Sequence, residues 1–143
     1  MESIPDPFID YNELTCEWVA ETPWSYKTRL PKVEKLLPHQ TAMLAFDGLD
    51  TFATVYLNSK PVLVSDNMFL SHRIDVTSEL SKSEESPELE IRFESAFKKA
   101  REIKDRHPEH KWVGYNGDMS RLAARKAQYH WCVIALPSCV SFC

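Results

Sequence analysis

The side chains of this 143-residue chain that could do chemistry are paired acidic residues, histidines and cysteines, and their spacing matches no known catalytic site. Acid/base catalysis by two carboxylates needs surroundings that separate their proton affinities. Glu84 and Glu85 are adjacent, but they lie among serines in the polar segment 81–87, so we expect a solvated turn. Spacing alone therefore assigns no catalytic residue.

Two groups of residues suggest a metal ion. His107-Pro-Glu-His110 contains a histidine pair, but Pro108 keeps the pair out of a helix. Because we expect no third ligand within reach in the sequence, the segment is interpreted as a surface loop. The second group has no Cys-x-x-Cys pair and is interpreted as incidental thiols beside a histidine: His130, Cys132, Cys139 and Cys143. The sequence therefore predicts neither a metal nor an organic cofactor.

A basic and aromatic strip at Arg121–Trp131 is the strongest candidate for a binding surface. Aromatic rings stack on bases in single-stranded nucleic acid, and the same residue types bind sugars. The 17 Lys and Arg residues against 21 Asp and Glu give a formal charge of −4, so we expect no nucleic-acid partner. Apart from this charge balance, composition alone does not distinguish a sugar-binding surface from one that binds nucleic acid.

Composition and the first residues also give an expected location. No apolar run approaches the ~20 residues needed to span a bilayer, so no membrane partner is expected. The segment Met1–Pro7 is acidic and contains two prolines, unlike a secretory signal. We therefore expect a cytoplasmic protein.

The elements that would position these residues are mostly strands. Six short segments alternate apolar and polar residues, or form short apolar runs, between turn signals: 26–30, 43–46, 54–57, 61–64, 71–76 and 89–93. Asn58 and Ser59 predict a two-residue hairpin between the third and fourth segments. One short helix is predicted over 95–106, with Ser95 as its N-cap and Ala96, Ala100 and Ile103 on one stripe. The pattern is typical of an all-β sandwich or barrel.

Four blocks of sequence, in this order, resemble the N-terminal sugar-binding domain of β-mannosidases of glycoside hydrolase family 2, most closely the intracellular fungal type: Trp18-Val-Ala-Glu-x-x-Trp24, Phe46–Asn58, Ser65–His72 and Arg125–Trp131. The resemblance implies a jelly-roll-like antiparallel β-sandwich of the galactose-binding-like kind. It also implies that Val55 and Leu57 point into the core, and that Met68 and Phe69 are core or domain-contact residues.

The resemblance stops after Trp131. The family continues into Gly-Trp-Asp-Trp-Gly-Pro, whose Trp-Asp-Trp part helps to hold the mannose, whereas this chain continues differently over 132–143. We therefore expect a partial β-sandwich domain over 1–131, incomplete at its C-terminus, and a non-family tail over 132–143 that reflects a retained intron, a frameshift or a gene-model error. His130 and Trp131 adjoin the missing run and are the candidate substrate-binding residues.

The resemblance implies the function of a longer enzyme. Relatives in this family hydrolyse terminal, non-reducing β-D-mannose residues of β-mannosides, and their two catalytic glutamates lie in a barrel that follows the sandwich. Because this chain lacks that barrel, it is expected to be inactive alone and to have no catalytic residue. A β-mannoside oligosaccharide is expected to bind only the full enzyme, in which this chain packs on the other domains. The alternatives are a free-standing carbohydrate-binding or protein-interaction module and a non-functional truncated product.

Overall fold

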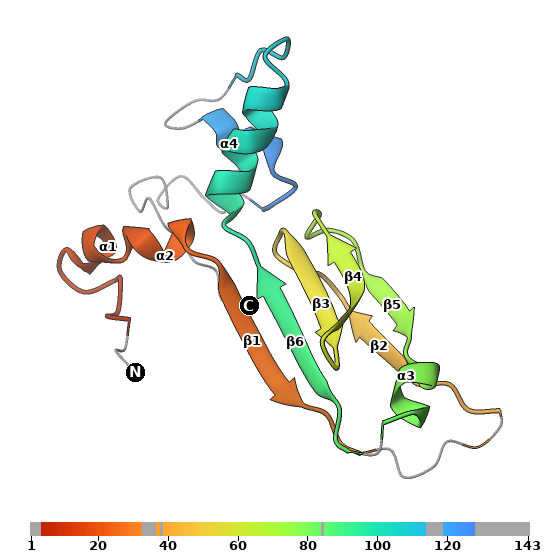
Figure 1. The fold of residues 1–143 in the computed structure, drawn as a ribbon. Helices are drawn as coiled ribbons and strands as arrows, with labels where there is room; N and C mark the ends of the chain where they lie inside the picture. The colour runs from red at the N-terminus through yellow and green to blue at the C-terminus, as the bar shows by residue number, and fades with distance from the viewer. Residues whose placement is uncertain (1–3, 33–36, 38, 84, 114–118, 128–143) are drawn as a thin grey trace. The chain divides into compact units, whose positions relative to one another are not determined.

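The computed structural model describes residues 4–32, 37, 39–83, 85–113 and 119–127. The chain divides into two compact units: Trp24–Phe93 forms one, and Met1–Pro23 together with Glu94–Cys143 forms the other. Each unit has its own secondary structure (Figure 1) and is considered by itself.

The unit Trp24–Phe93 contains two antiparallel sheets (Figure 1). The strands are β1 (Trp24–Arg29), β2 (Met43–Phe46), β3 (Ala53–Leu57), β4 (Lys60–Ser65), β5 (His72–Asp75) and β6 (Glu88–Phe93). Four of them form a sheet in the order β1-β6-β3-β4, and β2 pairs with β5. All six strands predicted from the alternation of residues are confirmed, as is the antiparallel β-sandwich class.

The apolar core of this unit gathers residues from both sheets. The buried side chains of β3 alternate with half-buried ones, and Val55 and Leu57 are both 0% exposed. The buried cluster of Leu49, Ala53 and Val55 is flanked by partly buried apolar side chains from β2, β4 and β6: Phe46, Val62, Leu63, Leu89, Ile91 and Phe93. The expectation that Val55 and Leu57 point into the core is confirmed.

The hairpin between β3 and β4 turns on two residues, as predicted. Leu57 pairs with Lys60, and the intervening Asn58 and Ser59 have φ of 49° and 65°. Positive φ at both central positions is typical of a type I′ turn, which matches the twist of the flanking strands. Asn58 also bonds Glu88 through backbone N–H and side-chain oxygen, both at 2.9 Å, and so ties the turn to the start of β6.

The second unit is helical in its described residues. It contains α1 (Asn12–Thr15), α2 (Glu17–Glu21), α4 (Ala96–Arg106) and the 3₁₀ turn η1 (Met119–Ala123). The predicted helix is confirmed as α4, and Ser95 caps it: its hydroxyl accepts from the Lys98 N–H at 3.2 Å and donates to the Ala20 carbonyl at 2.7 Å.

The remaining helical turns were not predicted. They include α3 (Thr77–Ser81) in the sheet-bearing unit, and each is too short to develop a helical apolar period. None of the helices in the described part of the chain is long and apolar enough to cross a membrane.

Candidate functional site

The resemblance assigns two residues to the substrate. His130 and Trp131 lie outside the described residues, as do the three C-terminal cysteines and Glu84. Their roles, and the boundary at residue 131, therefore stay predictions. Glu85 is exposed.

His72 and the Ser65–His72 block can be placed. The His72 Nε2 lies 3.2 Å from the hydroxyl oxygen of Ser65, which is 5% exposed, so His72 is a half-buried, hydrogen-bonded histidine as expected. Phe69 is 64% exposed and takes no part in the core, which leaves it available for contact with another domain.

Met68 is partly buried, and its carbonyl oxygen would lie 2.4 Å from a Cβ built on Gly48. Only glycine fits that close approach without movement of the backbone.

A polar network that sequence reasoning missed crosses the four-stranded sheet. Glu90 on β6 is directly opposite Lys27 on β1 and Tyr56 on β3. Its carboxylate accepts two bonds from the Arg92 guanidinium, at 2.7 and 3.0 Å, and lies 3.3 Å from the Lys27 ammonium. The Arg92 guanidinium in turn lies 4.5 Å from the centre of the Tyr56 ring. The alternation of charged residues in β6 was the available signal, but pairing across three strands is not visible in one strand.

The network fixes the charge of Glu90, which is only 5% exposed. Hydrogen bonding by Arg92, followed by that of Lys27, lowers the Glu90 pKa to about 2. The same bond to Glu90, with the nearby charge of Glu88, raises the Lys27 pKa. A carboxylate held so firmly in its ionised form is suited to holding strands together and not to donating a proton.

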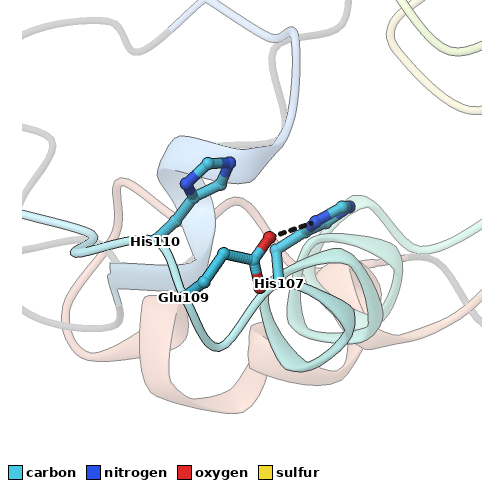
Figure 2. Close-up of side chains that lie close together, drawn as sticks. All are labelled: His107, Glu109 and His110. Carbon is cyan, nitrogen blue, oxygen red and sulfur yellow. Dashed lines mark hydrogen bonds and ion pairs between the residues drawn. The ribbon is translucent and has the colours of Figure 1, made fainter.

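A second cluster follows the end of α4. His107, Glu109 and His110 are exposed, and one potential ligand atom from each lies within 4.8 Å of the others. Figure 2 shows Glu109 between the two imidazoles, with its carboxylate bonded to His107 at 3.0 Å. Its own backbone N–H and then His107 lower the Glu109 pKa. From the sequence alone, Glu109 was not predicted to be a third ligand.

The fold and the sequence blocks define a class of protein, a β-sandwich accessory domain of glycoside hydrolases. The family model described as "Glycosyl hydrolase 2 galactose-binding domain-like" matches residues 1–139, and the chain belongs to this family.

Particular relatives narrow the class. The chain is 54% identical over 130 residues to Beta-mannosidase B of Thermothelomyces thermophilus and 50% identical over 128 residues to that of Emericella nidulans. In each case 90% of this chain is covered. The crystal structure of β-D-mannosidase from Dictyoglomus thermophilum covers 88% of the chain, with 32% identity and a TM-score of 0.71. The resemblance to the N-terminal domain of family 2 β-mannosidases is thereby confirmed. The chain spans about 15% of the length of these relatives.

Proposed function

We propose that this chain serves as the N-terminal β-sandwich of a β-mannosidase that removes terminal, non-reducing β-D-mannose residues from β-mannosides. The observation that carries the proposal is identity of 46–54% to proteins named Beta-mannosidase B over nine-tenths of the chain. In this proposal the β-mannoside oligosaccharide binds the full enzyme, with His130 and Trp131 next to the sugar.

The chain by itself should not hydrolyse a β-mannoside. Retaining glycosidases place two carboxyl groups about 5–5.5 Å apart, one of them with a raised pKa to act as general acid. Among the described residues, four carboxyl groups have a pKa that departs clearly from its ordinary value, and all four are lowered: Asp75, Glu79, Glu90 and Glu109. This direction opposes a general acid.

The decisive experiment transplants the domain. In the Thermothelomyces enzyme, the segment aligned with residues 1–131 is replaced by this chain's residues, and release of nitrophenol from p-nitrophenyl β-mannoside is measured. We expect the chimera to be active and the 143-residue chain alone to match a protein-free blank. A folded but inactive chimera would overturn the proposal, provided that the same transplant from the Emericella enzyme is active. Activity of the isolated chain would overturn the assignment of catalysis to other domains.

The contact with the other domains is proposed to include the first helical turns. Several large apolar side chains before and within α1 and α2 are strongly exposed: Phe8 77%, Ile9 54%, Tyr11 78%, Leu14 58% and Trp18 49%. Several large apolar side chains exposed within one short stretch of chain are typical of an interface. Since the relatives are several times longer than this chain, we propose that the rest of such a longer enzyme covers these residues, termed here the N-terminal apolar segment.

A cytoplasmic location is also proposed. Its support is Cys16, which is buried and not part of a disulfide, as suits a reducing compartment. Fractionation of cells that express the chain with a C-terminal tag would test the location, and recovery of a glycosylated or secreted form would contradict it.

A further inference from the structure

The turn after α4 brings three potential metal ligands together within four residues of sequence. The helix ends at His107, whose N–H bonds the Lys104 carbonyl, and Pro108 prevents the helix from continuing. The His110 N–H then bonds the His107 carbonyl at 3.1 Å and closes a turn. The helix end, the proline and this hydrogen bond constrain the backbone. The side chains at 107, 109 and 110 therefore start from positions close to one another.

The donor atoms are already close to the separation that a metal ion requires. Ligand atoms held at ~2.0–2.2 Å in a tetrahedral site lie about 3.3–3.5 Å from one another. The His107 Nδ1 and the Glu109 Oε1 are 3.0 Å apart, and all three donor atoms lie within 4.8 Å. The two imidazole rings are nearly parallel, with an interplanar angle of 23° and centres 5.6 Å apart. A closure of about 1–1.5 Å by side-chain rotation is enough, and exposed side chains rotate at little cost.

The third side chain is oriented by a neighbour. The His110 ring lies edge-to-face against Trp112, with centres 5.6 Å apart and planes at 85°. This edge-to-face contact favours one orientation of the His110 imidazole. Trp112 is itself partly buried, which makes it a firm support.

The donor set selects the class of ion. Two imidazole nitrogens and one carboxylate oxygen are ligands of Zn²⁺ and of other late first-row transition metals, whereas Ca²⁺ and Mg²⁺ prefer oxygen atoms alone. Since the three residues are exposed, water can complete the coordination. We propose that His107, Glu109 and His110 form a site for a divalent transition-metal ion, with Zn²⁺ as the ion that suits the three donors best.

The site would lock the C-terminal end of α4. An ion that joins residue 107 to residues 109 and 110 fixes the turn in one conformation, because it bonds side chains on both sides of Pro108. This role is separate from β-mannoside hydrolysis, which the proposed enzyme performs without a metal. The test of the metal site is therefore independent of the test of the proposed function.

The test is titration of the full 143-residue chain with ZnCl₂, followed by isothermal calorimetry and by NMR of the histidine ring signals. Cys132, Cys139 and Cys143 are replaced by serine throughout, so that thiols near His130 do not bind the ion. We expect one equivalent of Zn²⁺ to bind and to shift the ring signals of His107 and His110. The variants His107→Ala, His110→Ala and Glu109→Gln should each weaken binding at least tenfold.

A matched control uses His39, an exposed histidine outside the cluster. His39→Ala should bind Zn²⁺ as tightly as the parent protein. The proposal is overturned if Zn²⁺ binds only at millimolar concentration, as it does to any pair of surface histidines, or if the affinity is unchanged by the three variants. It is overturned equally if Zn²⁺ binds the unmodified chain but not the chain with the three serines, since the ion then belongs to the thiols. Circular dichroism of each variant confirms that loss of binding is not loss of folding.

Discussion

At the scale of single residues, Glu90 couples charge to fold most tightly among the residues that the structure describes. A nearly buried carboxylate needs partners to offset its lost hydration, and Glu90 has a bidentate guanidinium and an ammonium from the neighbouring strand. The cations are more exposed than the carboxylate, with side-chain exposures of 54% for Arg92 and 53% for Lys27. Their charges therefore remain hydrated while they stabilise Glu90.

Stability should consequently depend on pH through Glu90. Its pKa falls from 4.5 to about 2 on folding, so the folded state binds the proton more weakly than the unfolded chain. The stabilisation from Glu90 is present above pH 4.5 and is lost as the pH falls toward 2. In Glu90→Gln, the thermal midpoint at pH 7 should drop below that of the parent, and the two midpoints should converge near pH 2.

The control for this prediction is on the same strand. Glu88 is 44% exposed at its side chain and lies 3.5 Å from the Lys27 ammonium, so Glu88→Gln should change the midpoint much less. If the difference between the thermal midpoints of Glu90→Gln and the parent stays constant between pH 7 and pH 2, Glu90 is not the source of this pH dependence.

At the scale of elements, the β3–β4 hairpin contains a residue that is not the best choice for its backbone. Ser59 has φ of 65° and is exposed, and its neighbour Asn58 has φ of 49°. Asparagine tolerates the left-handed region, whereas an ordinary side chain there costs about 1–2 kcal/mol. Glycine avoids this strain but loses about 0.5–1 kcal/mol because its unfolded chain is freer.

Ser59→Gly should therefore raise the free energy of unfolding by about 0.5–1 kcal/mol, the difference between those two terms. Asn58→Ala should lower the free energy of unfolding by about 1–2 kcal/mol, because alanine tolerates a positive φ less well than asparagine and the Glu88 N–H loses its acceptor. Urea unfolding of both variants measures the changes. A loss of stability in Ser59→Gly would show that the serine side chain stabilises the turn by more than its backbone strain costs.

At the scale of the whole molecule, the exposure of apolar residues indicates how the chain is used. The strand β1 is exposed along most of its length, on both of its faces. The N-terminal apolar segment is exposed as well, although its residue types are normally buried. Four of the six β1 residues are polar, so only the exposed apolar segment supports the proposal that the chain lies against other domains of a longer protein.

The N-terminal apolar segment should contribute to the stability of the chimeric enzyme. Replacing Phe8 and Tyr11 by serine in the chimera should lower its thermal stability, by about 1–2 kcal/mol for each side chain that the interface buries. In the isolated chain the same pair should instead reduce concentration-dependent association, measured by sedimentation velocity. Val64→Ser combined with Leu70→Ser, at side chains that are 74% and 53% exposed in the other unit, provides a control in which two exposed apolar side chains are removed. Equal effects of the pair and the control would argue against an interface at this segment.

The sequence by itself determined the local elements of this protein. The six strands, the two-residue hairpin and the Ser95 cap were all predicted, because alternation, turn chemistry and capping depend on residues within a few positions of one another. The resemblance predicted the family and the buried Val55 and Leu57, which the comparisons and the structure confirm. It also named His130 and Trp131, whose role stays a prediction.

Only the tertiary structure decided which distant residues meet. The pairing of β6 with both β1 and β3 assembles the Glu90 network from three separate strands, and one strand's alternation does not reveal its neighbours. The need for glycine at position 48 likewise depends on a carbonyl twenty residues further along the chain, at Met68. The turn at His107 shows the same dependence over a short range. Its residues are neighbours in sequence, but whether their side chains lie close together depends on where the helix ends. Periodicity is a property of neighbours, whereas strand partners and close contacts depend on how the whole core packs.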